Sequence, residues 1–150
     1  MGRGLFCWNF HIIKKFYFYL LKLFISLYIK YTIMIIAIDF DGTCVTHEYP
    51  HVGKDIGAVP VLQQFVEDGH HLILYTMRSG KELEDAVQWF EDNNIPLYGI
   101  NKNPTQYKWT KSPKVYAHRY IDDAALGCPL ISSDLSSRPY VDWEEIKKYF

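Results

Sequence analysis

From Met34 onward, apolar and polar residues follow a pattern that predicts strands and helices in turn. Residues 35–39 form an uninterrupted and largely β-branched run, which is typical of a strand that is buried on both faces. Residues 59–68 instead repeat apolar side chains at helical spacing, and Gly69 follows where a helix would end. Residues 71–76 return to the strand pattern. This region therefore predicts a strand, a helix and a second strand.

The pattern continues to the end of the chain. Ser79-Gly80-Lys81-Glu82 matches a capping box, and the apolar residues after it recur at helical spacing up to Asn93. A polar loop is expected over 101–113. Three further elements are predicted: a strand over 96–100, a strand within 115–122 and a last helix that Asp142 caps and that ends near Phe150. Strands that alternate with helices indicate an α/β fold with a mainly parallel sheet.

The residues before Met34 differ from the rest in charge. No acidic residue precedes Asp39, and the segment 1–33 has a charge of +5, from Arg3, Lys14, Lys15, Lys22 and Lys30. The remainder has a charge of −6, and the whole chain of 150 residues has a charge of −1. The segment also holds 10 of the 25 aromatic residues. We therefore expect a hydrophobic, basic segment over 1–33 and a separate domain over 34–150, which is long enough to fold alone.

The apolar part of this first segment is a poor membrane span. Lys22 lies in its middle, and a central lysine costs roughly 2.5–3.5 kcal/mol on insertion scales. We interpret residues 1–33 as dispensable, translated only because a start upstream of Met34 was chosen. The alternatives are a segment that lies on a membrane surface and a structural helix.

Composition excludes some classes of protein. A pI of about 6.6 argues against a general nucleic-acid binder, which would carry a basic excess. Cys7, Cys44 and Cys128 are odd in number and lack CxxC spacing, so neither a disulfide framework nor a zinc ribbon is expected. These features favour a reducing, cytoplasmic location.

The strongest chemical signal is Asp39-Phe40-Asp41-Gly42-Thr43, which follows the first predicted strand. Ligands bind beyond the carboxyl ends of strands in open α/β sheets. Residues two apart in an extended chain point the same way, so Asp39 and Asp41 would face one site. Two ionised carboxylates repel each other, so such a pair implies a bound cation or a shared proton.

Four motifs follow one another in the order typical of the haloacid dehalogenase-like (HAD) hydrolase superfamily, which this sequence resembles over about 34–123. The first is the Asp39 motif, and the second is Thr76 at the end of a strand. The third is a lysine, for which Lys114 is preferred and Lys111 is the alternative. The fourth is the acidic pair Asp122-Asp123. The resemblance implies a three-layer, Rossmann-like fold of the small type without a cap domain.

By this resemblance the chain is a phosphomonoesterase. Asp39 would attack phosphorus and form an aspartyl-phosphate, while Asp41 would protonate the leaving oxygen and then activate water. Mg²⁺ would be held by Asp39, the backbone carbonyl of Asp41 and Asp122, with Asp123 nearby or acting through water. An Asp at the position of Asp41 favours a phosphatase within the superfamily.

The resemblance also implies where the phosphate would bind. Thr76 and Lys114 would hold the phosphoryl oxygens, and Arg78, ahead of a helix, would assist them. Only 35 residues separate Asp41 from Thr76, and 38 separate Thr76 from Lys114, which leaves no room for a cap domain. An open site suits a phosphate on a large or protruding substrate. The alternative is a homo-oligomer in which a second subunit closes the site.

Three alternatives accompany this reading. A non-catalytic module that binds a phosphorylated ligand would keep the same fold, and a phosphotransferase would keep the same motifs. His47-Glu48-Tyr49-Pro50-His51 also matches HExxH, which binds zinc from a helix. Pro50 would cost such a helix about 3 kcal/mol, so we interpret His47 and His51 as residues at the rim of the site.

Overall fold

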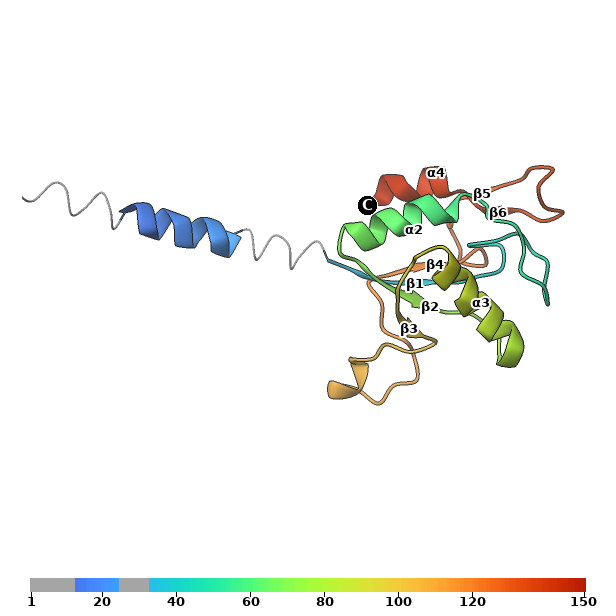
Figure 1. Ribbon diagram of the computed structural model, residues 1–150, viewed down its shortest axis with the longest axis horizontal. Coiled ribbons are helices and arrows are strands. Elements are labelled where there is room, and N and C mark those ends of the chain that lie inside the picture. The colour runs from blue at the N-terminus through green and yellow to red at the C-terminus, as the bar shows by residue number, and fades with distance from the viewer. Residues whose placement is uncertain (1–12, 25–32) are drawn as a thin grey trace, which may run out of the picture. The chain divides into compact units, whose positions relative to one another are not determined.

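The structure is a computed structural model that describes residues 13–24 and 33–150. The chain divides into two compact units, Met1–Ile33 and Met34–Phe150, at the same point as the boundary predicted from charge. In the first unit, residues 13–24 are helical with mainly exposed side chains, whereas Arg3, Cys7 and Lys30 lie outside the described residues (Figure 1). Within the described ranges, no helix is long and apolar enough to cross a membrane. Whether residues 1–33 are dispensable stays a prediction.

The second unit is built on a parallel sheet, as the alternating pattern predicted. Its strands are β1 (Ile35–Ile38), β2 (His71–Leu74), β3 (Leu97–Ile100) and β4 (Arg119–Ile121), in the order β3-β2-β1-β4 (Figure 1). All three strand pairs are parallel. With helices flanking the sheet, this confirms the predicted α/β fold of the three-layer, Rossmann-like class.

One face of the sheet carries the main hydrophobic core. Ile36 and Ile38 of β1 are fully buried there, against α2 (Ala58–Glu67) and α3 (Gly80–Asp92). The chain ends in α4 (Trp143–Ile146) and the 3₁₀ helix η2 (Lys147–Tyr149), which lie beside α2 (Figure 1). The Phe65 ring of α2 packs 4.3 Å from the ring of Phe150, centroid to centroid. The last residues therefore belong to the fold.

The opposite face of the sheet is covered by the polar segment 101–118 instead of a long helix. This segment holds only the short 3₁₀ helix η1 (Gln106–Lys108). The buried Gln106 side chain organises it, because its amide nitrogen donates to the carbonyls of Ser112 and Lys114 and its amide oxygen accepts from the backbone of Tyr116. Side-chain hydrogen bonds thus order a loop that lacks regular backbone pairing.

Local details differ from the sequence prediction in two places, and one predicted helix cap is confirmed. A hairpin of β5 (Leu130–Ile131) and β6 (Tyr140–Val141) was not predicted, because two-residue strands carry no periodic signal. Ser79 precedes α3 but makes no capping hydrogen bond through its side chain, so the capping-box contact is not formed. The predicted cap at Asp142 is confirmed, because its carboxylate accepts from the backbones of Glu144 and Glu145.

Candidate active site

Two neighbouring strands end side by side, and the acidic residues follow them at one edge of the sheet. Asp39 follows β1 and Asp122 follows β4, and the backbone N–H of Asp39 donates to the carbonyl of Ile121 at 3.0 Å. The neighbouring Phe40 is fully buried against Phe90, with 6.1 Å between ring centroids. Because side chains alternate along an extended chain, burying Phe40 turns Asp39 away from the core.

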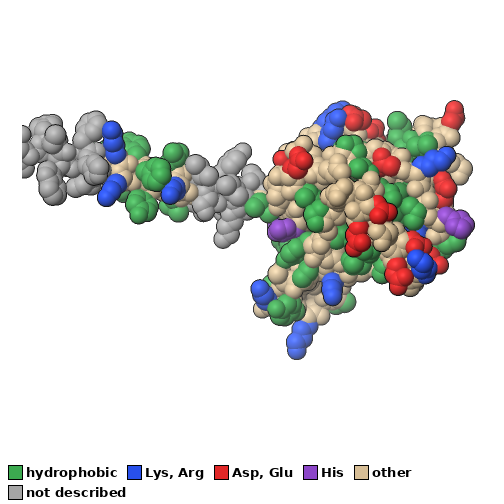
Figure 2. All heavy atoms as spheres, in the orientation of Figure 1, with side chains coloured by type: hydrophobic (Ala, Val, Ile, Leu, Met, Phe, Trp, Pro, Cys, Tyr) green, Lys and Arg blue, Asp and Glu red, His purple; other side chains and the backbone are tan. Residues whose placement is uncertain are grey.

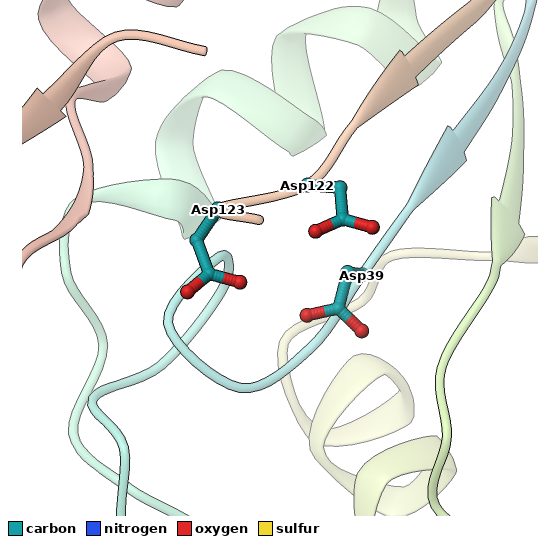
Figure 3. A group of neighbouring side chains, drawn as sticks. All are labelled: Asp39, Asp122 and Asp123. Atoms are coloured by element: carbon teal, nitrogen blue, oxygen red, sulfur yellow. The ribbon is translucent and has the colours of Figure 1, made fainter. Parts of the chain in front are cut away.

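Three carboxylates gather at this edge. Asp39, Asp122 and Asp123 each offer one oxygen, and these oxygens all lie within 4.8 Å of one another. Figure 3 shows Asp122 and Asp39 extending from adjacent strand ends, with Asp123 facing them from the chain that follows. Hard divalent cations such as Mg²⁺ prefer oxygen ligands of this kind. These three residues therefore fit a divalent cation, and the binding of Mg²⁺ by them and by Asp41 stays a prediction.

The electrostatics of the three carboxylates agree with this fit. The pKa of Asp39 is raised from 3.8 to about 7, chiefly by burial and also by the charges of Asp122, Asp123 and Asp41, against an opposing backbone hydrogen bond. Burial also raises the pKa of Asp123, while His47 and Arg138 act in the opposite direction. Negative charge is thus concentrated where it is poorly solvated, and a cation would relieve that cost.

Thr43 holds the acidic residues together. Its hydroxyl accepts a hydrogen bond from the backbone N–H of Asp123 at 3.0 Å and donates to Asp39 Oδ2 at 3.4 Å. The indole N–H of Trp143, in α4, donates to the carbonyl of Thr43 at 2.7 Å. The sequence motif contained Thr43, but no role was assigned to it, because only the fold brings Asp123 and Trp143 to this residue.

Asp41 lies apart from the three clustered carboxylates. Its two oxygens accept from the guanidinium of Arg78, at 2.8 Å from Nε and 2.7 Å from Nη2. Arg78 also donates to the carbonyls of Pro50, His51 and Glu82, and only 1% of its side chain is exposed. The hydrogen bond with Asp41 raises the pKa of Arg78.

This pairing corrects the role expected for Arg78. The sequence predicted a phosphate-binding arginine in front of α3, but the guanidinium is buried and engaged by protein oxygens. The sequence could not show this, because Asp41 and Arg78 are 37 positions apart in the chain. We therefore assign Arg78 to positioning Asp41, and its binding of phosphate is not supported by these contacts.

Thr76 lies near the end of β2, at the same edge of the sheet. Its backbone N–H donates to Asn101 Oδ1 at 2.9 Å, and its hydroxyl accepts from the backbone N–H of Arg78 at 3.2 Å. A hydroxyl that accepts one hydrogen bond still has its own proton to donate. Thr76 is therefore oriented by its neighbours, with a donor left for a ligand oxygen. Asn101 was not identified from the sequence, where it was read only as the start of a loop.

The two predicted lysines form no ion pair with the clustered carboxylates among the described residues. Lys114 is exposed and borders a pocket of about 300 Å³ beside Tyr120, and Lys111 borders a different pocket. Within residues 13–24 and 33–150, neither lysine forms an ion pair with a carboxylate. The choice between Lys114 and Lys111 as a phosphate ligand stays a prediction.

Two further residues lie near the carboxylates: His47, which the sequence placed at the rim of the site, and Arg138, to which the sequence assigned no role. His47 Nε2 lies 3.2 Å from Asp123 Oδ2, with 12% of the side chain exposed, so His47 is a wall of the site rather than part of its rim. The imidazole fits there because Gly42 has no side chain, as an added Cβ would lie 2.1 Å from Nε2. Arg138 comes from the unpredicted loop between β5 and β6 and contributes positive charge near Asp123.

The surroundings of the carboxylates are open and partly apolar. Met77, next to Thr76, and Leu126, just after the acidic pair, are fully exposed. Figure 2 shows hydrophobic and acidic side chains interspersed over the visible face of the Met34–Phe150 unit. The short segment between Asp41 and Thr76 contains α2 and β2 and no additional domain, in agreement with the expected absence of a cap at that position.

Fold and site together define an α/β protein of the Rossmann-like class with an acidic cluster at the carboxyl edge of its parallel sheet. The chain is similar to the solved structure of a conserved protein from Bacteroides thetaiotaomicron, at 33% sequence identity and a TM-score of 0.65. The match covers 78% of this chain and 88% of that one, and the chain belongs to the same family as that conserved protein. No protein-family model and no curated protein matches the sequence.

Proposed function

We propose that this chain is a Mg²⁺-dependent phosphomonoesterase of the HAD-like superfamily. The observation that carries the proposal is the group of Asp39, Asp122 and Asp123, with one oxygen of each within 4.8 Å of the others. Their order in the chain, after β1 and β4, is the order of the motifs that the sequence shares with the superfamily. A Mg²⁺ ion bound there would neutralise charge on the phosphate and on the carboxylates.

The residues of the chain would act in two steps. First, a carboxylate oxygen of Asp39 forms a bond to phosphorus while the bond from phosphorus to the ester oxygen breaks, and the leaving oxygen takes a proton. In the second step water attacks the aspartyl-phosphate, which releases phosphate and restores Asp39. Splitting the displacement in this way replaces one difficult step by two easier ones.

Asp41 is the residue proposed to move these protons. Its carboxylate, which Arg78 holds, would accept a proton from the attacking water, and the carboxyl group that has gained this proton would donate it to the next leaving oxygen. Thr76 would donate its hydroxyl proton to a phosphoryl oxygen, and Lys114 would add positive charge from the loop. A cytoplasmic location and a large or protruding substrate remain parts of this proposal.

A second candidate is a non-catalytic module that binds a phosphorylated ligand. One observation favours it: among the described residues, no lysine forms an ion pair with the three clustered carboxylates. Catalysis of phosphoryl transfer depends on positive charge around the phosphate, so the lysine would need to approach when substrate binds. A phosphotransferase would share the first step and differ only in its acceptor.

The test is hydrolysis of glycerol 3-phosphate by the full chain, followed as released phosphate with Mg²⁺ and with EDTA. We expect turnover only with Mg²⁺, and its loss in Asp39→Asn. Asp92→Asn is the matched control, because Asp92 is an exposed carboxylate at the end of α3. Turnover that survives in Asp39→Asn would rule out Asp39 as the nucleophile. Binding of phosphate without any turnover would favour the non-catalytic module.

A further inference from the structure

An exposed pair of tyrosines adjoins the carboxylates on the same face of the sheet. The pairing of Ile38 with Leu74 and with Ile121 continues by one residue, so Tyr75, Asp39 and Asp122 form one row across three strands. The backbone N–H of Tyr75 donates to the carbonyl of Ile38 at 2.7 Å, which supports this continuation. Side chains alternate along a strand, so all three point away from the core face that holds Ile38.

Tyr120 lies on that face too, two residues before Asp122 in β4. The ring centroids of Tyr75 and Tyr120 are 6.2 Å apart, with 62° between the ring planes. The residue of β1 that pairs with Tyr120 is the small Ala37, which leaves room for the two rings to approach each other. Although both tyrosines are large, 39% of Tyr75 and 41% of Tyr120 are exposed. The Tyr120 hydroxyl hydrogen-bonds the backbone of Val115 and Ala117, but part of both tyrosine side chains stays exposed beside the acidic cluster.

Tyr120 also lines a pocket of about 300 Å³, whose other lining residues come from segment 101–118. Trp109 and Tyr116 form another part of its wall, with their ring centroids 5.3 Å apart and their planes nearly perpendicular. The volume is at the lower end of the range for small-molecule pockets, about 300–1,000 Å³. From Asp39 to Tyr120 the sheet spacing is two residues along and one strand across, or about 8 Å.

The same segment carries the cations of this face. Four exposed lysines lie in it, namely Lys102, Lys108, Lys111 and Lys114, and none forms an ion pair with a described residue. Lys114 itself lines the aromatic pocket. Aromatic rings and lysines without ion pairs on one segment match the chemistry of a nucleotide, whose base stacks on aromatic rings and whose phosphates attract lysines.

We infer that this aromatic face, formed by Tyr75, Tyr120, Trp109 and Tyr116, binds the base of a nucleotide whose phosphate monoester lies at Asp39. The inference rests on the proposed function and narrows its substrate class. The sheet spacing of about 8 Å from Asp39 to Tyr120, a residue of the pocket wall, requires a spacer, which a sugar supplies. A phosphotyrosine has its ring joined directly to the phosphate and lacks that spacer. A free nucleotide and the phosphorylated end of a single strand share the chemistry that is recognised.

The experiment compares the full chain on 5′-AMP, on a single-stranded oligonucleotide with a terminal phosphate, on glycerol 3-phosphate and on a phosphotyrosine peptide. We expect kcat/KM for 5′-AMP or for the oligonucleotide to exceed that for glycerol 3-phosphate at least about fivefold. Tyr75→Leu and Tyr120→Leu should each lower this ratio at least about fivefold. Tyr75→Phe keeps the ring and should keep the ratio, whereas the Tyr120 hydroxyl bonds the backbone of Val115 and Ala117 and is left in place.

Tyr149→Leu is the matched control, because Tyr149 is an exposed tyrosine in η2 and should leave the ratio unchanged. Equal ratios in the wild type and both leucine variants, or a preference for the phosphotyrosine peptide, would overturn the inference. If glycerol 3-phosphate is hydrolysed in that case, the proposed function still stands. If no ester is hydrolysed, calorimetric titration of 5′-AMP in Mg²⁺ into the wild type and the leucine variants tests the aromatic face alone.

Discussion

Replacing Asp39 with asparagine should make the metal-free protein more stable at pH 8, although the variant should lose activity. The pKa of Asp39 is raised from 3.8 to about 7 in the folded protein. In the unfolded chain the same carboxyl has its ordinary pKa, so between about pH 4 and 7 only the folded protein holds the proton. The favourable contribution of the protonated carboxyl is therefore complete below about pH 4 and is lost as the pH rises to about 7.

The expected loss of stability depends on how much of the interval between about pH 4 and pH 7 the experiment covers. Each pH unit over which only the folded state is protonated changes the free energy of unfolding by about 1.36 kcal/mol. From pH 5 to pH 7 this amounts to about 2.7 kcal/mol as an upper bound. Asp39 interacts with the charges of Asp122 and Asp123, so the proton is shared among the three carboxylates and the effect of Asp39 alone is smaller. We expect the wild type to lose about 1–3 kcal/mol more than Asp39→Asn between pH 5 and pH 8.

The assay is urea unfolding of the full chain in EDTA, followed by circular dichroism at pH 5, 6, 7 and 8. Asp92→Asn is the control and should follow the wild type. Mg²⁺ added at pH 8 should raise the unfolding midpoint of the wild type more than that of Asp39→Asn, because the ion stabilises only the state that binds it. Parallel pH profiles for the wild type and Asp39→Asn would refute the electrostatic reasoning. An absence of stabilisation by Mg²⁺ would refute the metal site.

Three further substitutions test the contacts around the carboxylates by urea unfolding. Gly42→Ala should lower the free energy of unfolding by at least about 1 kcal/mol more than Gly127→Ala does. Both glycines have positive φ, but only at Gly42 would the new Cβ meet His47. Equal costs would show that the imidazole moves aside freely. Arg78→Met should lower the free energy of unfolding by about 3 kcal/mol because it leaves Asp41 unpaired. Lys81→Met, at an exposed lysine, should leave the urea midpoint unchanged. An unchanged midpoint in Arg78→Met would contradict the pairing of Arg78 with Asp41. Trp143→Phe should lower the free energy of unfolding by about 1–3 kcal/mol, because the Thr43 carbonyl loses its hydrogen-bond donor. An unchanged free energy of unfolding would mean that water replaces the indole N–H.

The elements that position the site could be predicted because their signals are local. The β-branched run before Asp39 predicted β1 to within one residue, and the helical spacing before Gly69 predicted α2 equally well. Parallel strands place their carboxyl ends at one edge, so the motifs at Asp39 and Asp122 could be expected to meet there. Periodicity and chain direction were sufficient for these features.

Other features depended on residues far apart in the chain, and only the tertiary structure decided them. The sequence allowed Arg78 to bind phosphate, whereas the fold buries it against Asp41, because an arginine with few water contacts must find oxygen partners within the protein. His47 was read as a rim residue, yet the space above Gly42 admits its ring beside Asp123. The covering of the second sheet face by a loop, which leaves Tyr75 and Tyr120 exposed, likewise has no periodic signal. The sequence by itself determined the strands, the helices and the acidic motifs; packing determined which charges are paired, which are left for a cation, and which aromatic surface stays open.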